Sequence, residues 1–286
     1  MKSKSKEKIK QAVRESYGKV ARAGGVTIGT NPAASCCNPS ETSTETARGE
    51  SCGCVLPGVS AKQMSALMGY SREDIISVIE GANTGLGCGN PVALASLQPG
   101  ETVVDLGSGG GFDCFLAAKK VGQTGKVIGM DMTPDMVGKA RENAEKMGMS
   151  NVEFRLGEIE NLPVADNSAD IIMSNCVINL STDKLSVYRE AFRVLKPGGR
   201  LAISDILATT TLPEEVQQDL ALVAACVGGA ATIEDTEKLL KEAGFQDIQI
   251  KPNDESRELI RQWNPAKSEN AADYVVSAYI EAVKPS

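Results

Sequence analysis

The sequence predicts an α/β fold: a doubly wound, mostly parallel sheet of seven strands, with an N-terminal extension and a smaller C-terminal α+β region. From Glu101 onward, short apolar runs alternate with stretches of helical length, which is the pattern of parallel strands joined by helices. A glycine-rich turn directly follows the first of these runs, as at the ligand-binding edge of such sheets. The 286 residues suffice for one sizeable core with extensions.

Seven segments have strand character. Five of them follow one another in the middle of the chain: T-V-V-D-L, K-V-I-G-M-D-M, V-E-F-R-L, A-D-I-I-M-S-N and G-R-L-A-I-S-D-I-L. Two more lie near the end, F-Q-D-I-Q-I and Y-V-V-S-A-Y-I-E-A-V. Helices are expected over residues 135–147 and 184–195, and K-P-G-G at 196–199 predicts a helix end and a turn. The central part of the chain therefore alternates between strand and helix.

Three regions are expected along the chain. Residues 1–70 form an N-terminal helix and a mobile cysteine-bearing segment, residues 71–205 the cofactor-binding domain, and residues 206–286 a C-terminal substrate-side region that completes the sheet. In the first region, Ile9, Val13, Tyr17 and Val20 recur at helical spacing, which predicts an amphipathic helix that docks on the domain with its lysines in water.

Two further helices are expected before the first strand. Ser71 and Asp74 form a helix-start signal for a helix over 75–79, because a serine N-cap and an acidic residue three positions later can cap each other's backbone. A helix is also expected to begin after Pro91.

Composition excludes several classes of function. Only 4% of residues are aromatic and the net charge is −7, so nucleic acid is not an expected partner. The basic N-terminus leads into polar sequence rather than an apolar signal core, and the longest apolar run, near 220–231, is too short to span a bilayer. We therefore expect a cytoplasmic protein with no membrane partner.

The cysteine and histidine counts narrow the chemistry. Eight cysteines in a reducing compartment indicate reactive or metal-binding thiols rather than disulfides. The sequence contains no histidine, which excludes serine and cysteine mechanisms with a histidine base, as well as histidine-ligated metals. Catalysis must therefore depend on carboxylates, thiols, backbone groups or a cofactor.

A nucleoside-binding signature follows the first strand. In D-L-G-S-G-G-G, from Asp105 to Gly111, residues without side chains let backbone N–H groups approach a ligand at the start of a helix. The second strand ends at Asp131, 22 residues after Gly109, where a carboxylate can accept hydrogen bonds from ribose hydroxyls. Glycines alone would also fit a plain tight turn, and the acidic residue at this distance favours the ligand site.

The motif resembles that of class I methyltransferases. Phe112 stands where a dinucleotide-binding motif has its third glycine, and D-x-G-x-G-x-G is similar to the methyltransferase pattern. G-E-I-E-N-L-P at 157–163 and R-V-L-K-P-G-G at 193–199 are similar to later motifs of the same enzymes. The resemblance implies S-adenosylmethionine as cofactor. It also implies the following cofactor-binding residues: Asp105, Gly107, Gly109, Asp131, Met132, Glu158, Ile159 and Asn175.

Three cysteines are placed for contact with a substrate. Ligands of parallel sheets bind beyond the carboxyl ends of the strands. Cys176 follows the fourth strand directly, Cys226 follows the fifth strand and its loop, and Cys88 lies in a glycine-rich loop before the first. A single cysteine is more often a buried small apolar residue, and Cys114 is interpreted in that way. Nearby glycines at Cys88 and Cys226 favour close approach of another group.

Further motifs resemble those of arsenite methyltransferases: G-L-G-C-G-N-P, G-S-G-G-G-F-D-C, D-M-T-P-D-M, S-N-C-V-I-N-L and C-V-G-G-A. The resemblance covers most of residues 81–245. It implies Cys88, Cys176 and Cys226 as catalytic thiols and arsenic ligands, with Cys88 serving in binding or redox turnover. A fourth catalytic thiol is implied near the N-terminus, at Cys37 or its neighbour Cys36.

The implied chemistry suits these residue types. Arsenic(III) is soft and prefers thiolates, and three thiolates leave it a lone pair that can attack the methyl carbon of the sulfonium. No permanent metal is expected. The resemblance also implies a thioredoxin- or glutathione-type reductant that resets a cysteine disulfide after each turnover.

Two alternatives remain open from the sequence. A class I methyltransferase acting on an organic small molecule would need a base, a carboxylate or tyrosine. A thiol-based metal-binding protein would hold zinc through Cys36, Cys37, Cys52 and Cys54, although C-C and C-x-C are poor matches to the usual C-x-x-C pairs. Cys52 and Cys54 have no counterpart in the arsenite methyltransferase pattern, so the resemblance assigns them no role. The sequence leaves the number of methyl groups and the oligomeric state undetermined.

Overall fold

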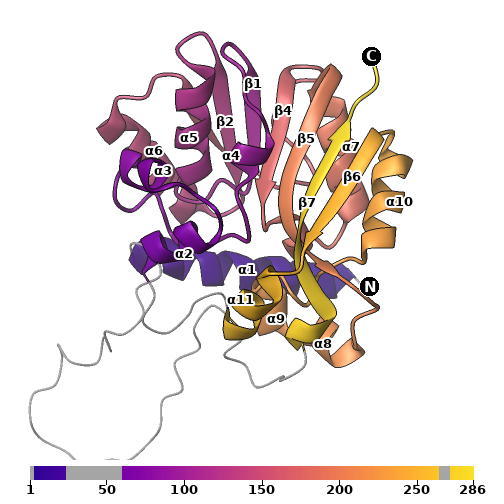
Figure 1. Cartoon of the computed structure of the whole chain (residues 1–286). Coiled ribbons are helices and arrows are strands. Elements are labelled where there is room, and N and C mark those ends of the chain that lie inside the picture. The colour runs from indigo at the N-terminus through magenta and orange to yellow at the C-terminus, as the bar shows by residue number, and fades with distance from the viewer. Residues whose placement is uncertain (1–2, 24–59, 264–270) are drawn as a thin grey trace, which may run out of the picture.

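A seven-stranded sheet in the order β3-β2-β1-β4-β5-β7-β6 runs through the molecule (Figure 1). The structure, a computed structural model, describes residues 3–23, 60–263 and 271–286. The strands are β1 (Thr102–Leu106), β2 (Lys126–Asp131), β3 (Val152–Leu156), β4 (Ala169–Asn175), β5 (Leu195–Ala208), β6 (Gln246–Asn253) and β7 (Val275–Val283). The first five pair in parallel, and β7 is antiparallel to both β5 and β6. The predicted fold class is confirmed.

Helices cover both faces of the sheet and its lower edge in Figure 1. They are α1 (Ser3–Ala23), α2 (Ala61–Leu67), α3 (Arg72–Ser77), α4 (Pro91–Leu94), α5 (Phe112–Val121), α6 (Pro134–Met147), α7 (Lys184–Val194), α8 (Glu214–Gln218), α9 (Leu220–Ala224), α10 (Ile233–Ala243) and α11 (Ser256–Trp263), with short 3₁₀ turns at η2 (Ile178–Leu180) and η3 (Ala271–Tyr274). The two larger apolar cores lie on opposite faces of the sheet. One includes side chains of α5 and α6, and the other those of α7 and α10.

Alternation along each strand divides the apolar residues between these cores. In β1, Val103 belongs to the core under α5 and Val104 to the core under α7. Ile171 and Ile172 of β4 are divided in the same way, and all four side chains are fully buried. Because successive side chains of a strand point to opposite faces, a continuous apolar run is what a strand covered on both sides requires.

Local signals set most helix boundaries. Ser71 and Asp74 form the expected capping box, and α3 begins at Arg72 but ends at Ser77, two residues before the predicted end. The helix after Pro91 is only four residues long. At K-P-G-G, α7 ends at Val194 as expected, but the predicted turn is wrong. Strand β5 begins directly after the helix, and residues 196–199 form an irregular stretch within that strand. A register shift between Ala169 and Ile171 of β4 accommodates residues 196–199: Ala169 pairs with Leu195, and Ile171 pairs with Arg200.

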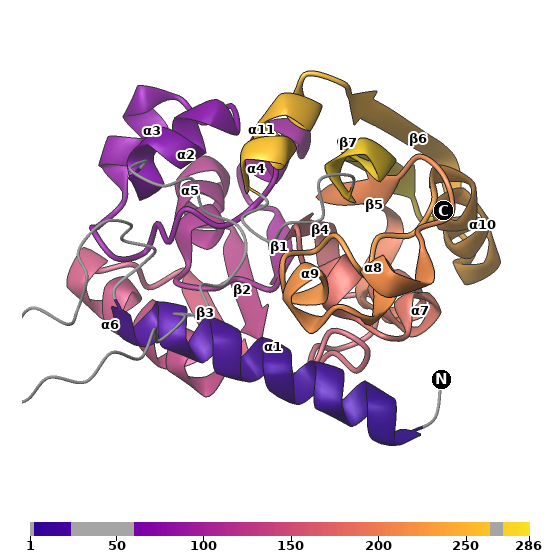
Figure 2. The same ribbon diagram turned by 90° about the horizontal axis from the view of Figure 1, so that it is seen from below.

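The predicted amphipathic helix is α1, and it crosses the edge of the sheet where the parallel strands end (Figure 2). Ile9, Val13 and Val20 are buried as expected. The expectation that its lysines lie in water is wrong for Lys10, whose side chain is only 17% exposed. Lys10 Nζ lies 2.7 Å from Glu158 and 3.4 Å from Glu160, because the segment after β3 presents carboxylates to the helix.

Two sequence expectations concern regions rather than elements. The proposed division at residue 205 falls within β5, and the sheet continues from there into β7 and β6. Cys36, Cys37, Cys52 and Cys54 lie outside the described residues. Among the residues that are described, none of the helices is long and apolar enough to cross a membrane.

Candidate active site

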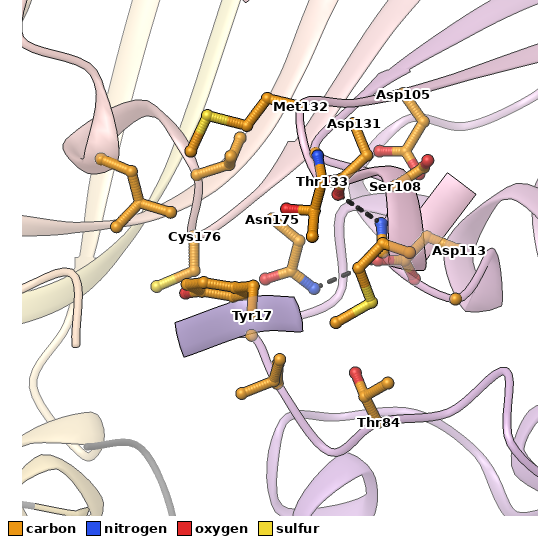
Figure 3. A pocket seen from close by; sticks show the side chains of 18 of the residues that line it. Tyr17, Thr84, Asp105, Ser108, Asp113, Asp131, Met132, Thr133, Asn175 and Cys176 are labelled. Atoms are coloured by element: carbon orange, nitrogen blue, oxygen red, sulfur yellow. Dashed lines mark hydrogen bonds between the residues drawn. The ribbon is translucent and has the colours of Figure 1, made fainter. Parts of the chain in front are cut away.

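A pocket opens where β1, β2 and β4 end, and α1 closes it from the side (Figure 3). Seven of the eight predicted cofactor-binding residues line it: Asp105, Gly107, Gly109, Asp131, Met132, Ile159 and Asn175. Glu158 is not among the lining residues, because its carboxylate pairs with Lys10 at 2.7 Å and Arg14 at 2.6 Å. These ion pairs hold the pKa of Glu158 below its usual value, with the Lys10 hydrogen bond the largest cause.

The glycine loop after β1 has room for a ligand on one side only. Gly107 has φ +73°, and a Cβ there would lie 2.5 Å from the Val177 side chain. Gly109 has φ +51°, and a Cβ there would meet no atom within 4 Å, so this side faces open space. Ser108 Oγ between them is buried and has no hydrogen-bond partner among the described residues, although it lines the pocket. A polar ligand would satisfy that oxygen.

Two buried carboxylates, those of Asp105 and Asp113, and the half-buried carboxylate of Asp131 surround the loop. Asp131 accepts hydrogen bonds from Gly109 N at 3.0 Å and Thr133 N at 2.8 Å. Asp105 accepts a hydrogen bond from the Cys114 thiol at 3.1 Å. Burial raises the pKa of both carboxyls, and that of Asp113 to about 6. These carboxylates are negatively charged hydrogen-bond acceptors. A ligand with positive charge and hydroxyl groups, such as S-adenosylmethionine, fits them, since its positive charges would offset the cost of burying the carboxylates.

Asn175, at the end of β4, connects the cofactor pocket to the loop that carries Cys88. Its Oδ1 accepts a hydrogen bond from Cys88 N at 3.0 Å. Its Nδ2 donates to Gly89 O at 3.0 Å, Tyr70 Oη at 3.0 Å and Asp113 Oδ2 at 3.2 Å. Tyr70 Oη in turn donates to Asp113 at 2.6 Å. The side chain predicted to bind cofactor therefore also fixes the position of a thiol.

The thiols of Cys88, Cys176 and Cys226 meet beside this pocket, although they come from three separate segments. All three residues are buried. The sulfur atoms of Cys88 and Cys176 and a carboxylate oxygen of Asp205 all lie within 4.8 Å of one another. Cys226 Sγ lies 2.8 Å from the carbonyl oxygen of Cys176, to which it donates. Of the three thiols expected to converge, the structure brings the sulfur atoms of Cys88 and Cys176 together and places Cys226 Sγ against the backbone of Cys176.

The environment keeps the thiols of Cys88 and Cys176 protonated. Hydrogen bonding with Cys226, then with Cys88, and burial raise the pKa of Cys176 well above its usual value. Burial raises the pKa of the Cys88 thiol. Two adjacent anionic sulfurs in a low-dielectric site would repel each other, so Cys88 and Cys176 favour the neutral thiol form until an electrophile binds them.

Sequence reasoning missed Lys10, Tyr17 and Asp113, which line the pocket, and also Tyr70 and Asp205, which lie beside lining residues. Asp113 lies in the first turn of α5. An acidic residue so close after the glycine loop could have indicated a side chain at the ligand site. Tyr17 lies on the apolar face of α1, and its hydroxyl donates to Ala224 O at 3.3 Å, two residues before Cys226. Tyr17, Asn175 and Cys176 all line the pocket (Figure 3). Nothing in the local sequence of Tyr17 indicates that position.

The sheet order, the glycine loop and the pocket define a class I methyltransferase, and residues 97–244 match the family described as "Methyltransferase domain". The crystal structure of an arsenic(III) S-adenosylmethionine methyltransferase from Chlamydomonas reinhardtii superposes with a TM-score of 0.59 and 32% identity, covering 79% of this chain and 74% of that one. The chain belongs to the arsenite methyltransferase family.

Curated relatives extend the comparison. An arsenite methyltransferase of Halobacterium salinarum is 54% identical over 222 residues, which is 78% of this chain and 56% of that protein. The human arsenite methyltransferase is 43% identical over 152 residues, 50% of this chain and 40% of that protein. The chain therefore spans about half the length of the curated relatives it matches.

Proposed function

We propose that this chain transfers a methyl group from S-adenosylmethionine to arsenic(III) held by the thiolates of Cys88, Cys176 and Cys226. The proposal is supported by the sulfur atoms of Cys88 and Cys176, which lie within 4.8 Å of each other beside a pocket suited to the cofactor, and by Cys226 Sγ, which lies 2.8 Å from the Cys176 carbonyl oxygen. Thiolates are the ligands that a soft metalloid prefers. The names of the relatives support the same substrate.

Bound S-adenosylmethionine supplies an electrophilic methyl group on a sulfonium. The residues of the chain hold and orient it: Asp131 would accept hydrogen bonds from ribose hydroxyls, and the glycine loop would offer backbone N–H groups. Asp105 and Asp113 would hold the ammonium of the methionine part, with Ile159 against the adenine. Positioning of donor and acceptor is then the principal contribution of the protein to the rate.

The arsenic site needs no general base. Each protonated thiol exchanges with one hydroxyl of arsenous acid, which leaves as water with the thiol proton, so three exchanges give a neutral tris-thiolate. The arsenic lone pair then forms the arsenic–carbon bond while the carbon–sulfur bond breaks and its electron pair passes to sulfur. This route accounts for catalysis by a chain without histidine.

Turnover requires a reductant. Methyl transfer leaves arsenic formally pentavalent, and two electrons from a thiol pair, which becomes a disulfide, return it to the trivalent state. We assign this role to the N-terminal thiol, Cys37 or Cys36, together with Cys88. A thioredoxin- or glutathione-type dithiol would reduce the disulfide again, which accords with a cytoplasmic location.

The test is to incubate the pure protein with arsenite, S-adenosylmethionine and a dithiol, and to measure S-adenosylhomocysteine and methylated arsenic. Both products should require arsenite. Cys176→Ser and Cys226→Ser should each abolish methylation and leave the affinity for S-adenosylmethionine nearly unchanged. Cys114→Ser is the matched control, because a hydroxyl can still donate to Asp105. Full activity in Cys226→Ser would remove that thiol from the site.

A further inference from the structure

A buried carboxylate lies beside two of the three thiols. Asp205 on β5 is 2% exposed, and one of its oxygens lies within 4.8 Å of both Cys88 Sγ and Cys176 Sγ, which are within the same distance of each other. Cys226 is outside this group, and its thiol donates to the Cys176 carbonyl oxygen. The structure therefore holds two sulfurs and one oxygen close together, and the arsenic site proposed above does not use the oxygen.

The spacing of these three atoms suits a tetrahedral metal ion. Zinc binds thiolate sulfur at about 2.3 Å and carboxylate oxygen at about 2.0 Å, so neighbouring ligand atoms of a tetrahedral site lie roughly 3.5 to 3.8 Å apart. Because the three atoms already lie within 4.8 Å of one another, a change of about 1 Å in each separation is sufficient. Cys176 also lines the cofactor pocket, which gives an ion a path from solvent.

Asp205 is oriented by hydrogen bonds, as carboxylates that bind metal ions are. Its Oδ2 accepts a hydrogen bond from Ile178 N at 3.0 Å, and its Oδ1 accepts bonds from Asn179 Nδ2 at 2.9 Å and Ile206 N at 2.8 Å. A carboxylate has about four acceptor positions, so these bonds leave room for an ion. The oxygen ligand is therefore in place before the ion arrives.

The charges around the group favour a divalent cation. Two thiolates and one carboxylate carry three negative charges, so a divalent cation leaves one of them to be compensated. The Lys184 ammonium interacts electrostatically with Asp205 and offsets that remaining charge. Ser204 Oγ lies 3.6 Å from Cys88 Sγ and can donate to this sulfur once it is a thiolate.

Arsenic and a divalent cation differ in the third ligand that they select. Arsenic(III) prefers sulfur to oxygen, which favours Cys226 over Asp205. Zinc is a borderline-soft ion that accepts carboxylate oxygen together with thiolate sulfur, which favours Asp205, the nearer group. Cys88 and Cys176 are common to the two ligand sets, so arsenic and the cation exclude each other.

We propose that Cys88, Cys176 and Asp205 form an exchangeable site for a borderline-soft divalent cation such as Zn²⁺, with water as the fourth ligand. Binding converts both thiols to thiolates, forms two zinc–sulfur bonds and one zinc–oxygen bond, and releases two protons to solvent. The site follows from the geometry alone. Its consequence, that the cation blocks arsenic binding, rests on the proposed function.

The test is a titration with Co²⁺, which takes tetrahedral sites and whose absorption reports its geometry and ligands. The parent protein is the full chain, reduced and free of dithiol, with its N-terminal cysteines replaced by serine: Cys36, Cys37, Cys52 and Cys54. One Co²⁺ per chain should bind with a sulfur-to-cobalt charge-transfer band. Zn²⁺ should displace it, and arsenite should compete with it.

Two variants of the parent separate the cation from arsenite. Asp205→Asn removes an anionic ligand and should weaken Co²⁺ binding roughly 100-fold, but arsenite binding less than tenfold. Cys226→Ser should do the reverse: arsenite affinity falls roughly 10- to 100-fold, and Co²⁺ affinity stays within about threefold. The matched control is Asp113→Asn, which removes another buried carboxylate, at the cofactor loop, and should leave Co²⁺ affinity within about threefold.

Equal weakening of Co²⁺ and arsenite in Asp205→Asn would overturn the inference, because the carboxylate would then act only on the shape of the site. Loss of Co²⁺ binding in Cys226→Ser, simultaneous binding of Co²⁺ and arsenite, or a parent protein that binds no Co²⁺ would overturn it as well. A parent protein that binds Co²⁺ but no arsenite would instead contradict the proposed function and leave the cation site intact. The two failures are therefore distinguishable.

Discussion

Replacement of Asp113 by asparagine tests whether this carboxylate holds the cationic part of the cofactor. Burial raises the pKa of Asp113 to about 6 in the ligand-free protein, and its oxygens accept hydrogen bonds from Tyr70 and Asn175. A cation binds the ionised carboxylate better than the protonated one. The affinity for S-adenosylmethionine should therefore be full above pH 7 and decline as the pH falls through 6.

The size of the effect follows from the ionised fraction. With a pKa of about 6, roughly 97% of the carboxyl is ionised at pH 7.5 and roughly 9% at pH 5. If only the ionised form binds, the affinity falls about tenfold across this range, equivalent to about 1.4 kcal/mol. In Asp113→Asn the affinity should be lower at pH 7.5 and should lose this tenfold dependence.

Isothermal titration calorimetry with S-adenosylmethionine at pH 5, 6, 7 and 7.5 measures the difference. Asp205→Asn is the matched control, because burial also raises the pKa of Asp205 to about 6, but this residue lies beside the thiols rather than at the cofactor loop. It should retain the dependence of the wild-type protein. An unchanged pH profile in Asp113→Asn would refute the reasoning and move the titrating group to Asp105 or Asp131.

Two further predictions concern α1 and the Cys226 turn. Lys10→Glu places a negative charge beside Glu158 and so weakens the contact that holds α1 over the pocket. In stopped-flow measurements, S-adenosylhomocysteine should then dissociate roughly tenfold faster. The control, Lys8→Glu on the exposed face of α1, should have no effect. Equal rates for both variants would contradict a covering role for α1. Gly229→Ala should lower the free energy of unfolding by about 1–3 kcal/mol in urea, because its Cβ would overlap the Asn179 carbonyl. Gly138→Ala, with open space in α6, should instead stabilise by about 0.5–1 kcal/mol; a similar effect of both changes would argue against the overlap.

The sheet and the cofactor loop could be predicted because their signals are local. Apolar runs give buried strands wherever both faces are covered, and the glycines at 107 and 109 are needed for backbone conformations set within a few residues. Cys176 could be placed at the ligand edge for the same reason, since it directly follows a strand. The K-P-G-G segment shows the limit of this reasoning. Its glycines fit a turn or a bulge equally well, and pairing with β4 decided for the bulge.

The amino-acid sequence by itself determined the fold class and placed the glycine loop and Cys176 at the carboxyl ends of strands, because periodicity, turn chemistry and residue type act over short stretches of chain. Only the tertiary structure decided where Glu158 directs its carboxylate, since its partner Lys10 lies 148 residues away. The same holds for the contacts from Asn175 to Cys88 and from Asn179 to Cys226, which join segments 87 and 47 residues apart. Hydrogen bonds over such separations form only after the chain has packed, and short-range patterns contain no record of them.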